Sequence, residues 1–226
     1  LIVSNEKGNN DAVNISSFFN DYAEDFSSIY KEDIKKRSSF NKKMDQLFRK
    51  DIEIRFDATI ALTEKDSIKS VLDIGCGPGH FVVKFLEQGK EVTALDIAPS
   101  MLEITKKRVE SMQINSKFET ILADYAEYEF SNKFDAVCVM GFFDYVQEPV
   151  KILKKLLTET NKELYLYFPD NKGWLAWQRK IRYKLRNCPL YLYSKNYLDA
   201  CLKEADCFHL AEIRDTDRGY YVIIRK

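Results

Sequence analysis

The stretch that decides the fold of this chain is Val71-Leu72-Asp73-Ile74-Gly75-Cys76-Gly77-Pro78-Gly79-His80-Phe81. Residues 71–74 have β character, three glycines follow at alternate positions, and an amphipathic run begins at Phe81. This order predicts a strand, a tight turn and the start of a helix. Glycine suits a turn whose backbone takes an unusual φ or comes close to a ligand. Because the N-terminus of a helix offers free N–H groups, the stretch predicts a ligand pocket at the C-terminal edge of a sheet.

The glycine spacing distinguishes two classes of ligand. A dinucleotide-binding turn has the form G-x-G-x-x-G. Here Gly79 follows Gly77 after two positions rather than three, and an acid, Asp73, stands inside the strand. The phrase D-I-G-C-G-P-G resembles motif I of the class I S-adenosylmethionine-dependent methyltransferases. The plainer alternative is a turn without a ligand, which would need neither three glycines nor an acid.

The resemblance implies roles for the residues of this turn. In the family, the glycine loop lies against the amino-acid part of the cofactor, and the strand acid helps to hold its ammonium group. Cofactor contacts are therefore expected from Asp73, Gly75, Cys76, Gly77 and Gly79.

A second strand, over residues 91–95, ends at Asp96. This acid follows Gly75 by roughly 20 residues, the distance expected of a carboxylate that binds a ribose. A carboxylate can accept hydrogen bonds from both ribose hydroxyls. The phrase that follows Asp96 resembles one in the family and implies cofactor contacts by Ile97 and Met101. The alternative is that Asp96 only caps the next helix.

Two further strands end in candidate site residues. After the strand over 117–122, the resemblance implies that Asp124 takes the adenine amino group, while Tyr125 stacks or donates its backbone N–H. A solvent-facing loop acid is the alternative for Asp124. The strand over 134–140 resembles motif IV and brings Met140 towards the methyl group. Family members often carry a histidine or asparagine phrase just beyond it; here Asp144 and Tyr145 are the expected substrate-side catalytic residues, and a histidine base lacks support.

Strands and helices alternate from residue 70 onward, which predicts a parallel sheet with helices on both faces. The fold class expected is α/β: a Rossmann-like, seven-stranded, mostly parallel sheet with a C-terminal antiparallel hairpin and an N-terminal helical extension. The fifth strand is predicted over 163–168, and a helix capped by Ser194 follows. The hairpin is predicted from strands over 208–213, which contains His209, and 220–224, with a turn over 214–219.

The N-terminal part is predicted to be a separate helical extension. Residues 1–14 are polar and expected to be loose. Aromatic residues at helical spacing predict a helix over 15–30, and apolar residues predict a second over 41–63. The first helix resembles the cofactor lid of small-molecule methyltransferases, which makes Tyr22 a cofactor candidate; an ordinary packed helix is the alternative. The expected boundaries are 1–66 for the extension and 67–226 for the methyltransferase domain.

The segment 172–198 is the least generic part of the chain. It contains seven basic residues, no acid, and both tryptophans, with Trp174, Trp177, Ile181 and Leu185 at helical spacing. Three interpretations remain open: a cap insertion at about 171–193 that recognises an anionic substrate, a surface for RNA or lipid headgroups, or a cationic helix docked by its tryptophans.

Composition narrows the class of protein. The 226 residues carry 35 basic and 35 acidic side chains, so no global field draws the chain to nucleic acid or a membrane. Apolar runs are too short for a spanning helix, and Leu1-Ile2-Val3 is too short for a secretory core. Five scattered cysteines without a C-x-x-C pair and two histidines favour reduced thiols, a cytoplasmic location and no metal site.

These patterns together predict an S-adenosylmethionine-dependent methyltransferase that acts on a small, anionic molecule and releases S-adenosylhomocysteine. One alternative is an RNA or protein methyltransferase that uses the basic segment 172–198. Others are a protein that binds the cofactor without catalysis, and a nicotinamide enzyme, which the glycine spacing disfavours.

Overall fold

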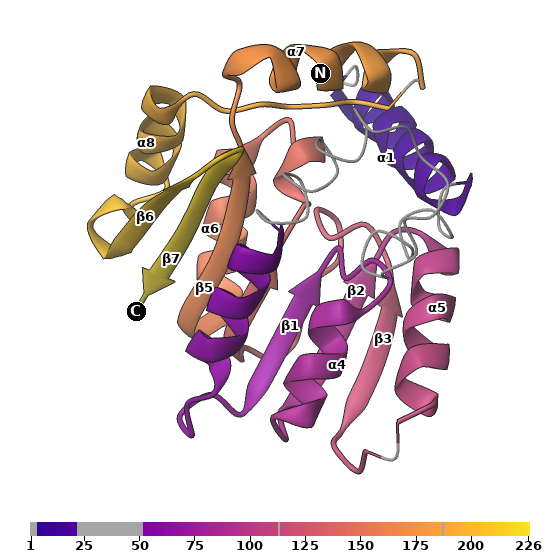
Figure 1. The fold of residues 1–226 in the computed structure, drawn as a ribbon. Coiled ribbons are helices and arrows are strands. Elements are labelled where there is room, and N and C mark those ends of the chain that lie inside the picture. The colour runs from indigo at the N-terminus through magenta and orange to yellow at the C-terminus, as the bar shows by residue number, and fades with distance from the viewer. Residues whose placement is uncertain (1–3, 22–51, 113, 187) are drawn as a thin grey trace, which may run out of the picture.

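The computed structural model describes residues 4–21, 52–112, 114–186 and 188–226. A seven-stranded sheet in the order β3-β2-β1-β4-β5-β7-β6 forms its centre (Figure 1). Only β7 runs against the other strands, because it pairs antiparallel with both β5 and β6. The predicted fold class is confirmed. The strands are β1 (Ser70–Ile74), β2 (Glu91–Asp96), β3 (Phe118–Leu122), β4 (Phe134–Val139), β5 (Thr160–Pro169), β6 (Ala211–Thr216) and β7 (Gly219–Arg225).

Helices cover both faces of the sheet (Figure 1). One face carries the helix over residues 52–63 together with α4 and α5, and the other carries α6 and α8. The helices are α1 (Ser4–Asp21), α4 (His80–Glu87), α5 (Pro99–Glu110), α6 (Pro149–Glu159), α7 (Gly173–Lys184) and α8 (Lys195–Glu204), with short 3-10 turns η1 (Phe143–Tyr145) and η2 (Phe208–Leu210).

The strands alternate between two apolar cores, because successive side chains point to opposite faces. Leu72 of β1 and Val137 of β4 join the core under α6 and α8. Their neighbours Val71 and Cys138 join the core under α4. Both faces of a parallel sheet are covered by helices, which explains why these strands read as nearly continuous apolar runs.

The chain reverses its direction of winding at β1, whose neighbours are β2 on one side and β4 on the other. Such a switch point leaves a crevice at the carboxyl ends of the strands, where α/β proteins bind ligands. The backbone N–H groups of Gly75 and Cys76 donate to the Leu95 carbonyl oxygen at 2.8 and 3.1 Å. These bonds fix the loop after β1 against the end of β2.

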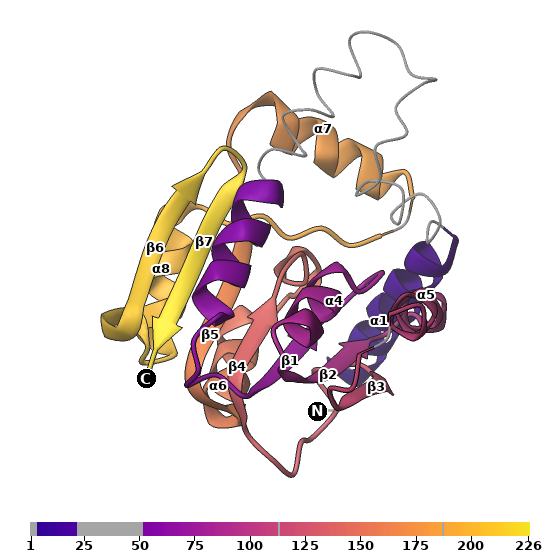
Figure 2. The same ribbon diagram turned by 60° about the horizontal axis from the view of Figure 1, so that its bottom comes forward.

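Two helices lie over this carboxyl edge, α1 and α7 (Figures 1 and 2). The Ser16 hydroxyl of α1 donates to the Ile97 carbonyl oxygen at 3.0 Å. The Phe18 ring packs 5.5 Å from the ring of Tyr183 on α7. The two helices therefore contact each other as well as the edge of the sheet.

Three details of the predicted secondary structure are corrected. Residues 4–14 are helical rather than loose, since α1 begins at Ser4 and is anchored by the packing of Phe18. His209 lies in η2, not in a strand, and β6 begins at Ala211. The turn predicted over 214–219 spans only residues 217–218, because Thr216 at the end of β6 pairs with Gly219 at the start of β7. Within the helix predicted over 41–63, residues 52–63 are helical and the others lie outside the described residues.

All five cysteines are buried and free. No helix in the described part of the chain combines the length and the apolar character needed to cross a bilayer.

Gly219 is predicted to be intolerant of any side chain. A Cβ there would lie 2.3 Å from the Phe168 carbonyl oxygen and 2.7 Å from the Tyr167 ring. We expect Gly219→Ala to lower the free energy of unfolding by about 3 kcal/mol, because the two paired strands must move apart. Gly89→Ala is the control: its φ is +73° with no atom within 4 Å, so only backbone strain of about 1 kcal/mol is expected. Urea denaturation measures both, and equal losses would contradict the steric explanation.

Candidate functional site

A cavity of about 970 Å³ occupies the carboxyl edge beneath α1 and α7. It brings together most of the residues predicted from sequence, which come from the ends of four strands. Those that line it are Asp73, Gly75, Cys76, Gly77, Asp96, Ile97, Met101, Asp124, Tyr125, Met140, Asp144 and Tyr145. Gly79 is not among them, and Tyr22 lies outside the described residues.

The glycine loop combines an open surface with a tightly packed base. Gly75, Gly77 and Gly79 all have positive φ, at +66°, +53° and +75°. No atom lies within 4 Å of a Cβ built on Gly77, so its backbone is open to a ligand. A Cβ on Gly79 would lie 2.6 Å from Thr105, whose hydroxyl donates to the Gly77 carbonyl oxygen at 2.8 Å. Gly79 does not line the cavity, and the lack of a side chain there lets α4 and α5 approach each other.

Asp96 connects the loop after β1 to the loop after β2. Its Oδ2 accepts the Gly77 N–H at 2.8 Å and its Oδ1 accepts the Ala98 N–H at 2.9 Å. Burial raises the pKa of Asp96, while these backbone donors act against the rise. A carboxylate has about four acceptor positions, so both oxygens keep capacity for further donors. The side chain thus organises the loops and still lines the cavity.

Asp73 is a buried acid one residue before the carboxyl end of β1. Its Oδ2 has no hydrogen-bond partner. Burial, followed by the repulsion of Asp96, raises the pKa of Asp73 to about 8, and the thiol of Cys138 lowers it slightly. An unsatisfied buried carboxyl is costly. The unpartnered Oδ2 of Asp73, with Asp96 nearby, fits a cationic ligand group such as an ammonium.

The stability of the free protein is predicted to fall as the pH rises from about 4 to about 8. Over this range folded Asp73 keeps a proton that the unfolded chain releases, since its pKa is about 8 rather than 3.8. Asp73→Asn should flatten this decline. Urea denaturation at several pH values measures it, with exposed Asp66→Asn as the control. An identical pH slope in Asp73→Asn and wild type would contradict the assignment.

Asp124 and Tyr125 follow β3 and face different surroundings. Asp124 lines the cavity, and its Oδ1 accepts the Ala126 N–H at 2.9 Å. The Tyr125 ring is buried, and its hydroxyl donates to Glu159 Oε2 at 2.6 Å on the side away from the cavity. Of the two roles expected for Tyr125, this hydrogen bond favours the one that uses its backbone N–H.

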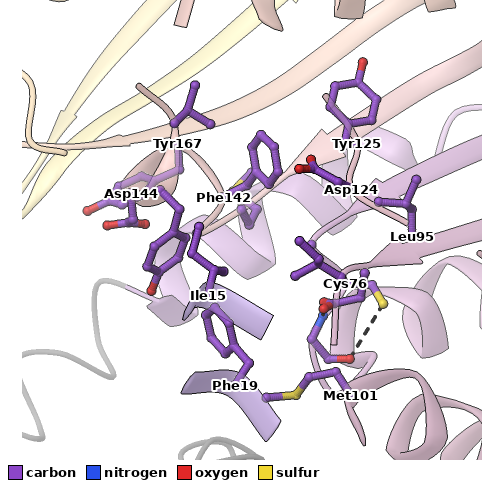
Figure 3. A pocket seen from close by; sticks show the side chains of 18 of the residues that line it. Ile15, Phe19, Cys76, Leu95, Met101, Asp124, Tyr125, Phe142, Asp144 and Tyr167 are labelled. Carbon is purple, nitrogen blue, oxygen red and sulfur yellow. Dashed lines mark hydrogen bonds between the residues drawn. The ribbon is translucent and has the colours of Figure 1, made fainter. Parts of the chain in front are cut away.

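The expected catalytic pair lies in η1 and lines the cavity. Figure 3 shows Asp144 on the other side of the cavity from Asp124. Asp144 is buried and forms an ion pair with Arg179 of α7. The Tyr145 hydroxyl lies 3.2 Å from that of Tyr183, also on α7. Burial is the main reason that the pKa of Tyr145 is raised well above its usual value. Neither group is therefore arranged as a simple proton acceptor.

Sequence reasoning missed the inward-facing residues of α7. Ala176, Arg179 and Tyr183 share one face, with spacings of three and four, and this regularity was the available signal. Arg179 and Tyr183 line the cavity, whereas the tryptophans are exposed. The interpretation in which the tryptophans dock the helix is wrong, because the smaller and polar face packs inward.

Arginine and aromatic side chains line the end of the cavity that contains Asp144. The Arg55 guanidinium lies 3.5 Å from the centre of the Tyr167 ring, and Arg218 lines the wall between β6 and β7. Phe19 of α1 packs edge-on against Tyr145 at 5.3 Å. The cavity thus has an acidic end at the glycine loop and a basic, aromatic end below α7.

His80 begins α4 and contacts Arg108, whose guanidinium lies 2.6 Å from His80 Nδ1. Because the arginine is the donor, this ring nitrogen is an acceptor. His80 also lines the cavity. Among the described ranges, no three His, Cys, Asp or Glu side chains form a group that could hold a metal.

The switch-point cavity, the glycine loop and the buried acids are the features of a Rossmann-like fold of the class I methyltransferase type. Residues 71–162 match the family described as "Methyltransferase domain". The chain is similar to the magnesium protoporphyrin IX methyltransferase of Synechocystis PCC 6803, solved with bound S-adenosylhomocysteine, with a TM-score of 0.73 and 17% identity over 96% of this chain and 100% of that one.

Two curated relatives each match 44% of this chain. The malonyl-[acyl-carrier protein] O-methyltransferase of Anoxybacillus flavithermus is 31% identical over 44% of this chain and 38% of its own length. The ubiquinone biosynthesis O-methyltransferase of Actinobacillus pleuropneumoniae is 26% identical over 44% of each. The chain thus matches less than half the length of these relatives. Residues 71–162 match the methyltransferase domain family, and the chain shares its fold with solved S-adenosylmethionine-dependent methyltransferases.

Proposed function

We propose that this protein is an S-adenosylmethionine-dependent methyltransferase that acts on a small anionic molecule. The observation that carries the proposal is the division of one cavity into an acidic end at the glycine loop and a basic, aromatic end below α7. Bound S-adenosylmethionine supplies an electrophilic methyl group, and S-adenosylhomocysteine is its product.

The acidic end fits the cofactor. We assign the ammonium to Asp73, whose Oδ2 has no partner, and the ribose hydroxyls to Asp96. The open backbone of Gly77, with Gly75 and Cys76, lies beside the amino-acid part. The walls around the base and the sulfur are assigned to Leu95, Ile97, Met101, Asp124, the Tyr125 backbone and Met140.

The basic end fits the acceptor. Arg55, Arg179 and Arg218 line it, and arginine binds carboxylates and phosphates in a planar, two-bonded geometry. In the free protein Asp144 holds Arg179 in place, so we assign Asp144 to positioning rather than to proton removal. Tyr145 is assigned to donate a hydrogen bond to the substrate, since its raised pKa keeps the phenol protonated.

Enclosure favours a small acceptor over a polymer. We propose that α1, within the extension at 1–66, and α7, within the insertion at about 171–193, form a lid that excludes water and orients the reacting groups. Both helices line the cavity from above. The relatives named as O-methyltransferases favour an oxygen acceptor. An RNA or protein acceptor would need these helices to open widely.

The test separates cofactor binding from methyl transfer. Calorimetry with S-adenosylhomocysteine and NAD is expected to detect binding of the first alone. Label from methyl-labelled S-adenosylmethionine is then followed into a panel of hydroxylated carboxylic acids and phosphates, each paired with its neutral amide or alcohol. Transfer to an acid but not to its neutral partner supports the proposal. Binding without transfer to any class would instead indicate a cofactor-binding protein, and NAD binding would indicate a nicotinamide enzyme.

A further inference from the structure

The outer face of α7 is an exposed apolar stripe. Its side chains are Trp174, Trp177, Ile181 and Leu185, with exposed fractions of 66%, 52%, 40% and 80%. Their spacings of three, four and four place them along one side of the helix. The rings of Trp174 and Trp177 pack together, with centroids 4.5 Å apart. We call these four residues the outer stripe.

The stripe is not needed to hold α7 in place. The opposite side of the helix is already packed, with Ala176 and Tyr183 buried and Arg179 paired with Asp144. An amphipathic helix on a globular protein normally turns its apolar side inward. Here the larger apolar side chains point outward, so the stripe is available for a partner. Figure 1 shows α7 at the outer edge of the molecule, beyond the carboxyl ends of the strands.

The charges around the stripe are positive. Exposed basic residues flank it at Lys172, Lys180, Arg182, Lys184 and Arg186. No acid occurs between Asp170 and Asp199 in the sequence. Asp170 and Asp217 lie beside the N-terminal end of the helix, where they line a small hollow with Lys172. The stripe therefore has a cationic border on a chain whose net charge is zero.

We propose that the outer stripe docks the protein on the surface of an anionic lipid bilayer. Tryptophan, isoleucine and leucine on one side of a helix with lysine and arginine around them are the features of a helix that lies in the membrane interface. The basic residues match the negative headgroups. RNA fits less well, because base stacking would use the tryptophans but not Ile181 or Leu185.

Docking would also set the direction in which the cavity faces. Arg179 and Tyr183 line the cavity from the inner side of the same helix that carries the stripe. A bilayer bound to the outer side would therefore lie directly above the lid. The proposal does not depend on methyl transfer, since lipid binding can be measured without a substrate.

The chain offers a built-in probe, because Trp174 and Trp177 are its two tryptophans. The protein is titrated with phosphatidylcholine vesicles with and without phosphatidylglycerol. We expect a blue shift of the emission with the anionic vesicles, weakened by high salt. Phosphatidylglycerol vesicles with brominated acyl chains should quench the emission, because the indoles enter the interface. No shift and no quenching with anionic vesicles would overturn the proposal.

Two double variants test the apolar and the electrostatic contributions to lipid binding separately. Ile181→Ser/Leu185→Ser keeps both tryptophans and should weaken vesicle partitioning at least about tenfold, through loss of apolar burial. Exposed Leu122→Ser on β3 is its control and should not change partitioning. Lys180→Glu/Arg182→Glu should weaken binding by at least about 25-fold, at about fivefold per charge. Its control, Lys106→Glu/Lys154→Glu, reverses two exposed charges on other helices.

Every variant is first shown to bind S-adenosylhomocysteine, so loss of folding is distinguished from loss of docking. If the control pairs weaken vesicle binding as much as the α7 pairs, the attraction is nonspecific and the proposal fails. It also fails if the Ile181→Ser/Leu185→Ser variant abolishes RNA retention, or dimerisation measured by sedimentation, while vesicle binding is unchanged.

Discussion

Asp96→Ala is expected to weaken S-adenosylhomocysteine binding by at least about 100-fold in calorimetry. Hydrogen bonds to a charged group contribute about 1.5–3 kcal/mol each, and the proposed site uses two from the ribose. The variant also removes the acceptor that holds the Gly77 N–H at 2.8 Å and the Ala98 N–H at 2.9 Å. Both loops that contact the cofactor should then lose their fixed geometry.

The control is Glu91→Ala, which removes an exposed acid from the first residue of the same strand. It should leave binding unchanged. Asp96→Asn keeps one carbonyl acceptor and should weaken binding less than alanine does. If Asp96→Ala bound S-adenosylhomocysteine as tightly as wild type while remaining folded, the ribose assignment would be contradicted.

Asp144→Ala is expected to lower the free energy of unfolding by about 3–5 kcal/mol and to reduce turnover strongly. The cause is the Arg179 guanidinium, which would be left buried without its carboxylate. Burial lowers the pKa of Arg179, but Asp144 together with Tyr183, Tyr145 and Tyr167 outweighs this and raises the pKa overall. The loss should therefore come mainly from a stranded charge rather than from a missing contact.

A double-mutant cycle tests this cause directly. The variant Asp144→Ala/Arg179→Met removes both charges and should recover most of the stability lost by Asp144→Ala, as measured by urea denaturation. Turnover should stay low, because Arg179 is part of the proposed substrate end. The matched control is exposed Lys195 with Asp199, an ion pair on α8 whose removal should cost about 0.5 kcal/mol or less. Additive losses at Asp144 and Arg179 would contradict the pairing.

The glycine loop was predictable because its requirements are local. Three positive-φ positions, an acid in the strand and Asp96 at the end of the next strand are all set by short-range geometry. The mostly parallel sheet with its C-terminal hairpin was predictable from the alternation of apolar runs and helices along the chain. What the sequence pattern did not indicate is that Gly79 packs against Thr105 rather than facing the cavity.

The substrate end was less predictable because it depends on contacts between distant segments. Periodicity identified two sides of the helix over 173–184, but not which side packs inward. The pairing of Arg179 with Asp144 joins residues 35 positions apart. The buried orientation of the Tyr125 ring likewise depends on the hydrogen bond from its hydroxyl to Glu159, which lies on α6. Such choices follow from three-dimensional packing, which no local pattern contains.

The decisive measurement is the structure of the complex with S-adenosylhomocysteine. We expect the ribose hydroxyls within hydrogen-bonding distance of the Asp96 carboxylate, the ammonium at Asp73 and the sulfur facing Asp144 and Tyr145. A nucleoside bound elsewhere, or an Asp96 carboxylate that contacts neither hydroxyl, would contradict this expectation.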